Sequence, residues 1–153
     1  KPTAVPNTYQ TLLASSDTAL DTKNLQIIGR GNTANNHAGY SQQNADTVDL
    51  LDGDTEIVQD TSYVLTVYSN GTTIYARVNG LAQTLNADTG GNNGDWWDDS
   101  ADKDNVTLGA VKRTAETNFF AGYISEVVVY DRVLSEGEIV NVEDYLNTKY
   151  VVY

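Results

Sequence analysis

A long polar loop near the middle of the chain, Asn86–Asn105, has the residues best suited to bind a ligand. Its carboxylates could hold a calcium ion, because calcium takes several oxygen ligands, often from loop aspartates and backbone carbonyls. The spacing does not complete an EF-hand, since Lys103 and Gly109 stand where that motif needs Gly and Glu. Two interpretations therefore stay open: a solvated acidic loop, or a calcium site formed by Asp98, Asp99, Asp102 and Asp104.

The same loop contains two adjacent tryptophans, Trp96 and Trp97. An exposed indole packs against the C–H face of a sugar, while neighbouring Asp and Asn oxygens accept hydrogen bonds from its hydroxyls. This pattern predicts a sugar site formed by Asn93, Asp95, Trp96 and Trp97. The alternative is that both tryptophans only anchor the loop to the core.

The sequence argues against catalysis. Glycoside cleavage needs two carboxyl groups at a fixed separation, and no strand carries such a pair at the usual spacing. His37, the sole histidine, lies in the polar segment Asn32–Tyr40, where we expect an ordinary loop residue. A second acidic segment, Asp49–Glu56, is expected to be a solvated turn with Asp52-Gly53 at its corner, and the alternative is a cation site.

Short segments rich in Val, Ile, Tyr and Thr, separated by Asn, Asp and Gly, indicate an antiparallel β-sandwich. An Asn-Gly pair at Asn70 predicts a hairpin. The expected strands are Thr8–Ser15, Asn24–Arg30, Ser62–Ser69, Thr72–Gly80, Asn105–Val111 and Gly122–Tyr130.

The C-terminal part predicts a strand followed by a helix. Three consecutive valines, Val127–Val129, favour a strand covered on both faces. Ser135 and Glu138 form a capping box, and apolar residues at helical spacing follow. We expect a helix over Glu136–Asn147 that packs Ile139, Val142 and Leu146 against the sandwich.

This C-terminal segment, "FFAGYISEVVVYDRVLSEGEIVNVEDYLNTKY", resembles the closing part of bacterial laminin-G-like domains in the concanavalin A-like lectin/glucanase superfamily. "TVYSNGTTIYARVNG" and "VTLGA" resemble that family's central hairpin and next strand. The resemblance implies an all-β antiparallel jelly roll with a short C-terminal helix. It also implies strands before Thr8, so the first strands are missing, supplied by another chain or rearranged.

The 153 residues are expected to form a single domain, residues 1–153. The chain begins at Lys1 without a methionine, so we expect either processing or a piece of a longer polypeptide. A net charge of -12 argues against nucleic acid, and no apolar stretch approaches the ~18 residues that a membrane span needs.

These features predict a non-catalytic extracellular module that binds glycan or a cell-surface polysaccharide, or mediates adhesion. The alternative is a structural surface domain of a phage virion or an extracellular filament, with neighbouring subunits as partners.

Overall fold

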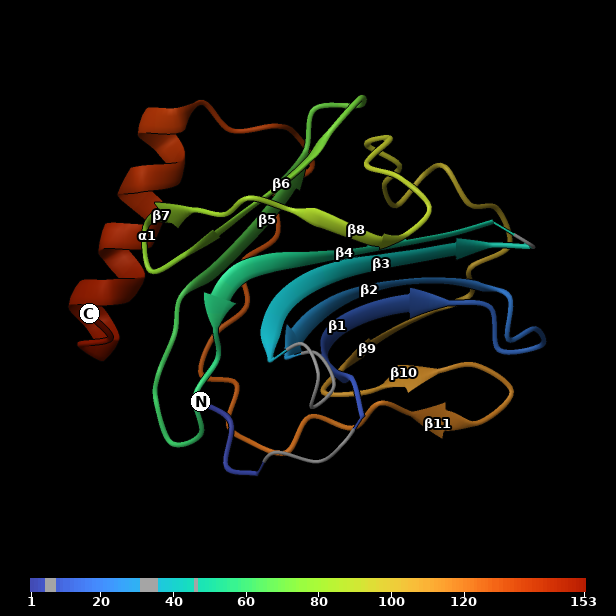
Figure 1. Cartoon of the computed structure of the whole chain (residues 1–153), viewed down its shortest axis with the longest axis horizontal. Helices are drawn as coiled ribbons and strands as arrows, with labels where there is room; N and C mark the ends of the chain where they lie inside the picture. Colours follow the sequence, from blue (N-terminus) through green and yellow to red (C-terminus); the bar gives the residue numbers. More distant parts are fainter. Residues whose placement is uncertain (5–7, 31–35, 46) are drawn as a thin grey trace.

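The computed structural model describes residues 1–4, 8–30, 36–45 and 47–153. The chain forms an antiparallel β-sandwich followed by a C-terminal helix (Figure 1). In chain order the elements are β1 (Gln10–Ser16), β2 (Lys23–Arg30), β3 (His37–Asn44), β4 (Thr47–Glu56), β5 (Leu65–Ser69), β6 (Ile74–Val78), β7 (Leu81–Ala82), β8 (Asn86–Thr89), β9 (Asn105–Leu108), β10 (Val111–Lys112), β11 (Glu116–Thr117) and α1 (Glu136–Tyr150).

The larger sheet has the strand order β8-β4-β3-β2-β1-β9, and neighbouring strands are antiparallel. Its inner face carries rows of side chains that pair across strands. Ile27 pairs with Tyr40, and Tyr40 pairs with Leu51. Tyr40 and Leu51 are fully buried and form the main core cluster with Leu25 and Ile74. Burial of these large side chains is the main force that holds the two sheets together.

The smaller sheet, β5-β6-β7, packs over this inner face. Ile74 and Val78 lie on one face of β6 and are buried, as the alternation of a strand requires. Val78 contacts Ala38 and Ile57 in a second core cluster. Figure 1 shows β5 and β6 crossing the larger sheet, with α1 beyond β7.

The opposite face of β1 and β2 is also covered, by the segment that follows β11. Asn118 donates a hydrogen bond to Gln26 (2.8 Å), and Thr11 donates to the same Gln26 oxygen (2.7 Å). Gln26 in turn donates to Asn24 (2.7 Å). This buried network satisfies polar groups that would otherwise destabilise the fold.

Most of the predicted strands are present, with shifted or shorter bounds. The first runs Gln10–Ser16, the Asn-Gly hairpin joins Leu65–Ser69 to Ile74–Val78, and the strand predicted at Asn105–Val111 is divided into β9 and β10. The all-β fold class with one C-terminal helix is confirmed.

Two predictions for the segments around β3 and β4 were wrong. Asp49–Glu56 is not a solvated turn but belongs to β4, with Asp49 and Asp52 buried. His37 opens β3, although part of its predicted loop, residues 31–35, lies outside the described residues. Acidic residues lower strand propensity, but pairing with β3 and β8 on both sides overrides this preference.

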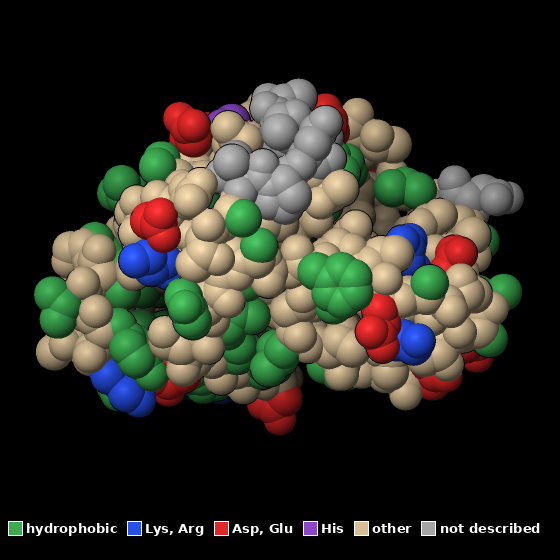
Figure 2. All heavy atoms as spheres, turned by 90° about the horizontal axis from the view of Figure 1, so that it is seen from below, with side chains coloured by type: hydrophobic (Ala, Val, Ile, Leu, Met, Phe, Trp, Pro, Cys, Tyr) green, Lys and Arg blue, Asp and Glu red, His purple; other side chains and the backbone are tan. Residues whose placement is uncertain are grey.

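The segment Gly122–Tyr130 differs from its prediction. Gly122 makes an isolated bridge to Pro2, and Tyr123 exchanges hydrogen bonds with Lys1, but the rest forms no strand. Val127–Val129 are exposed rather than covered, and Val129 is 68% accessible. On the face shown in Figure 2, hydrophobic side chains gather towards the side where Figure 1 places α1.

The helix α1 packs on the smaller sheet through an ion pair. Its capping box is present, and it extends to Tyr150, three residues beyond its predicted end. Ile139 is buried, while Val142 and Leu146 are half-buried. The buried Glu143 carboxylate binds Arg77 Nε (3.0 and 3.1 Å) and accepts a hydrogen bond from Thr66 (2.7 Å). This helix is neither long nor apolar enough to cross a lipid bilayer, and the described residues contain no other.

Glu143→Ala is expected to lower the free energy of unfolding by about 3–5 kcal/mol, because it leaves the Arg77 guanidinium buried without its partner. Urea denaturation measures the change. Asp144→Ala, an exposed neighbour on the same helix, is the control and should stay within about 0.5 kcal/mol of the parent. Equal stability of both variants would show that the ion pair does not hold the helix.

Acid should weaken the start of α1. Hydrogen bonds from Arg132 and Ser135 lower the pKa of Glu138 to about 2, whereas an unfolded Glu titrates near ~4.3. The stabilisation by Glu138 is therefore complete above about pH 4.3 and is lost as the pH falls towards about 2.

The parent should melt at a higher temperature than Glu138→Gln above about pH 4.3. This difference should shrink as the pH falls from about 4.3 towards about 2. Glu136→Gln, in the same helical turn, serves as the control. A difference that does not change with pH would contradict this assignment.

Candidate functional site

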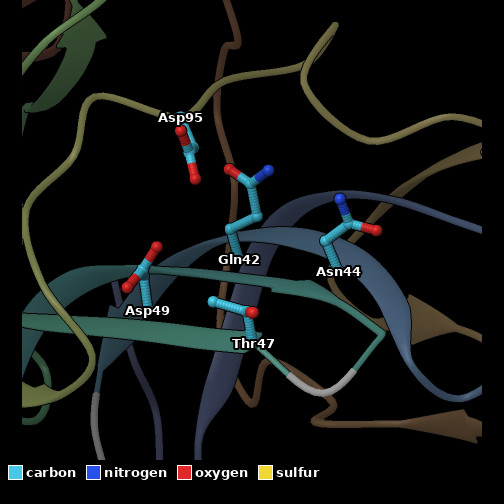
Figure 3. A pocket seen from close by; sticks show the side chains of 5 residues that line it. All are labelled: Gln42, Asn44, Thr47, Asp49 and Asp95. Atoms are coloured by element: carbon cyan, nitrogen blue, oxygen red, sulfur yellow. The ribbon is translucent and has the colours of Figure 1, made fainter.

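The inner face of β3 changes from apolar to polar along its length. Ala38 and Tyr40 belong to the core, whereas Gln42 and Asn44, the next residues on that face, border a hollow. The hollow has a volume of about 140 Å³ and is lined by Gln42, Asn44, Thr47, Asp49 and Asp95. Figure 3 shows the β3 and β4 side chains rising from the sheet and Asp95 pointing down from the loop.

The loop that roofs the hollow is fixed to β4 by Asp49. Its buried carboxylate accepts hydrogen bonds from the Gly91 amide (2.8 Å) and from Asn93 Nδ2 (3.4 Å). Buried carboxylates need such partners, because an unpaired charge in the interior is costly. Asp49 therefore positions the roof as well as lining the hollow.

The roof is also fixed to the smaller sheet. Asn92 accepts a hydrogen bond from the Ile74 amide (2.6 Å) and donates one to the Ile74 carbonyl (3.0 Å). Gly94 has φ of 79° and passes so close to Thr72 that an added Cβ would lie 2.4 Å from its backbone. Ser69 donates a hydrogen bond to the Gly94 carbonyl.

Trp96 and Trp97 are half-buried, and both pack against the main core cluster. The Trp96 ring stacks on Tyr40 (centroids 5.8 Å apart, planes at 15°) and meets Trp97 edge-on (6.3 Å, 81°). In this arrangement the tryptophans anchor the loop, which was the alternative interpretation. Ligand binding by Trp96 and Trp97 stays a prediction.

The Tyr40 hydroxyl ties the floor of the hollow to its roof. It donates a bifurcated hydrogen bond to Gln42 Oε1 (2.5 Å) and to the Asp95 carbonyl oxygen. Burial, with Asp95, Asp49 and Asp99 nearby, raises the pKa of Tyr40, so the hydroxyl stays protonated. Gln42 is 2% exposed, and its Nε2 makes no hydrogen bond within the described part of the chain.

The Asp95 side chain faces the hollow, and no described residue donates a hydrogen bond to its carboxylate. Burial and the charges of Asp99 and Asp49 raise the pKa of Asp95. Asn93, the remaining residue of the predicted sugar site, is exposed and turned towards Asp49. Of the predicted sugar site, Asp95 therefore lines the hollow and Asn93 lies in the loop that roofs it.

The four aspartates of the predicted calcium site point to different partners. Asp99 accepts from the Trp96 amide (2.5 Å), Asp102 pairs with Lys23 (2.5 Å), and Asp104 accepts from Thr18 (2.6 and 2.9 Å). Asp98 is exposed. Within the described ranges, no group of three or more His, Cys, Asp or Glu side chains is placed to hold a metal ion. In this arrangement Asp98, Asp99, Asp102 and Asp104 do not fit a calcium site. Comparing the melting temperature of the protein in calcium and in a chelator would measure whether calcium binds.

A second hollow, of about 320 Å³, lies farther along β4. His37 borders it together with residues from β4 and β8, namely Asp52, Gly53, Asp54, Asn86, Ala87 and Asp88. It is wider, and like the first hollow it has no aromatic side chain among the described residues that line it. None of the residues of the predicted sugar site borders it, whereas Asp95 lines the first hollow. We therefore take the first hollow as the candidate site.

Comparisons with known proteins agree with this architecture. The Laminin_G_3 family model, described as the concanavalin A-like lectin/glucanases superfamily, matches residues 1–140. The chain belongs to this superfamily. No curated protein matches the sequence.

Two solved structures share the superfamily fold. The CBM40 domain of the Ruminococcus gnavus IT-sialidase, bound to alpha2,3 sialyllactose, is 21% identical with a TM-score of 0.76; the match covers 94% of this chain and 78% of that one. A second structure of this CBM40 gives 18% identity and a TM-score of 0.62, with 93% and 78% coverage.

Sequence reasoning missed the floor of the hollow. Gln42, Asn44 and Thr47 were not singled out, and Asp49 was placed in a solvated turn. One signal was available: Ala38, Tyr40, Gln42 and Asn44 alternate with residues of the other face, which is the period of a strand.

Gly94→Ala is expected to destabilise the protein more than Gly71→Ala. Both glycines have positive φ, 79° and 88°, but a Cβ at Gly71 meets nothing within 4 Å. Gly71→Ala should therefore cost only the backbone strain, about 1–2 kcal/mol, while Gly94→Ala also pushes the loop away from Thr72. Urea denaturation compares the two, and tryptophan fluorescence should change only for Gly94→Ala. Equal losses would mean that the loop is not held at Gly94.

Proposed function

We propose that this chain is a non-catalytic carbohydrate-binding module that acts outside the cell and holds one sugar residue in the hollow between β3, β4 and the Asn86–Asn105 loop. The supporting observation is the lining: amide, hydroxyl and carboxylate groups of Gln42, Asn44, Thr47, Asp49 and Asp95 surround a recess beside a stacked tyrosine and tryptophan. Sugar recognition uses a small number of such convergent polar groups.

The size of the hollow limits what it takes. At about 140 Å³ it is smaller than the ~300 Å³ at which pockets for larger ligands begin. It therefore suits the end or a single unit of a glycan, with the rest of the polymer outside. The CBM40 structure with sialyllactose shows that the same fold can present a site for a sugar.

Hydrolysis is not part of this proposal. Both oxygens of Asp49 accept hydrogen bonds from the loop, so this carboxylate is occupied with holding the roof. Glycoside hydrolysis needs two available carboxyl groups, one as acid and one as nucleophile or base. In the lining of the hollow only Asp95 is then available. Release of reducing sugar by the purified protein, abolished by Asp95→Asn, would contradict this assignment.

The test is retention on immobilised glycans, with Gln42→Met as the site variant and Gln43→Met as its matched control. Adjacent strand residues point to opposite faces, so only Gln42 faces the hollow. Gln42→Met should lose about tenfold or more in affinity, because it removes an amide that meets sugar hydroxyls. Gln43→Met should bind like the parent.

Asn44→Ala gives a second variant, since Asn44 is exposed and its loss should not disturb the fold. It should weaken retention while leaving the melting temperature within a few degrees of the parent. The proposed function is wrong if no immobilised glycan retains the parent protein. It is also wrong if the glycan retains Gln42→Met, Gln43→Met and Asn44→Ala as well as it retains the parent.

A second candidate function is a structural domain on a virion or filament surface. The observation that favours it is the segment after Tyr123: Val127–Val129 are exposed, and no backbone hydrogen bond reaches them among the described residues. Such a segment can accept a strand from a neighbouring subunit. Concentration-dependent assembly in analytical ultracentrifugation, together with no glycan retention, would favour this candidate.

A further inference from the structure

The charge of the hollow restricts the sugar it can hold. We propose, on the basis of the proposed function, that the hollow selects a sugar with a protonated amine and rejects carboxylated sugars. The observation that carries this proposal is that two carboxylates, Asp49 and Asp95, line the hollow above the buried side chain of Gln42.

Both ionisable groups that line the hollow are acids. Asp49 rises from β4 and Asp95 descends from the loop, while the remaining lining side chains are uncharged. The Asp95 carboxylate receives no hydrogen bond from a described residue, so it is available to a ligand. A ligand carboxylate would add a third negative charge at close range, whereas an ammonium group would offset the existing two.

The cationic side chains of this region lie outside the hollow. Lys23 pairs with Asp102 (2.5 Å), and Arg77 pairs with Glu143 (3.0 Å). Lys103 lies near Asp98 and Asp99 with its Nζ buried and without a hydrogen-bond partner, and it does not line the hollow. No described Lys or Arg is therefore placed in the hollow to receive a ligand carboxylate.

Gln42 shows that this is a built site rather than a group of surface acids. The residue is 2% exposed and lines the hollow, and its Nε2, which is turned towards Asn44, has no hydrogen-bond partner among the described residues. Nε2 is not among the buried polar atoms that lack a partner, so this donor stays accessible and water or a ligand can satisfy it. The floor thus offers a donor to a sugar oxygen, and Asp95 offers an acceptor to an ammonium group on the opposite side.

The proposal separates this chain from the CBM40 structure to which it is similar. Sialyllactose carries a carboxylate, and that domain is seen bound to it. The two chains are only 21% identical, so the side chains that line their sites can differ although the fold is the same. The acidic lining of this chain predicts the opposite charge preference.

The experiment compares short oligomers of glucosamine, N-acetylglucosamine and galacturonic acid, of equal length, by isothermal titration calorimetry near neutral pH. These probes present an amine, a neutral amide and a carboxylate. The glucosamine oligomer should bind about tenfold or more tightly than the acetylated one. The galacturonic acid oligomer should give no measurable binding.

Asp95→Asn is the site variant, and Asp98→Asn on the same loop is the control for general surface charge. Asp95→Asn should lower the ratio of the affinity for the glucosamine oligomer to that for the acetylated oligomer from about tenfold or more to near one. Asp98→Asn should leave both affinities as in the parent.

The outcomes test the charge preference separately from the carbohydrate-binding function. If the neutral oligomer binds and the amine adds nothing, or if the acidic oligomer binds, the charge preference is wrong while the carbohydrate-binding function stands. An equal effect of Asp98→Asn and Asp95→Asn would assign the preference to the acidic surface as a whole and overturn the proposal. If no oligomer binds and no immobilised glycan is retained, the carbohydrate-binding function falls together with the charge preference.

Discussion

The buried carboxylate of Asp49 is the contact on which the candidate site depends. It sits on the inner face of β4 and is 4% exposed, so bulk water does little to satisfy its charge. The Gly91 amide and the Asn93 side chain do so instead. Because a buried charge without partners would destabilise the fold, the strand and the loop fix each other's position. The geometry of the hollow follows from this requirement.

The rest of the sandwich keeps that geometry rigid. Tyr40 stacks on Trp96 and shares its hydroxyl proton between the floor and the roof. Asn92 and Gly94 hold the same loop against β5 and β6, and the Arg77–Glu143 pair holds α1 on that sheet. The loop is thus attached to both sheets, and a shift of one sheet against the other would change the shape of the hollow.

The fold was predictable from the sequence, while the site was only partly so. Apolar residues alternating in segments such as Ile74–Val78 predicted the strands, and Ser135 with Glu138 predicted the start of α1. Asp49 was misplaced because its burial depends on hydrogen bonds from a loop about forty residues later, which local composition does not record. The prediction for Gly122–Tyr130 failed for a related reason. Three valines indicate a strand, but a strand needs a neighbour to pair with, and among the described residues only those near Gly122 have one.

The neighbours of β1 bear on how the chain folds. Strands β1 to β4 pair in sequence order, so they can form hairpins as soon as they are synthesised. The second neighbour of β1 is β9, and Ser16 meets Asn105 across 89 residues of chain. Until β9 is made, β1 is an open sheet edge, and closing it costs the entropy of a long loop. Pairings this distant in sequence slow folding, so a partly synthesised chain exposes an edge strand that a chaperone or another nascent chain can reach.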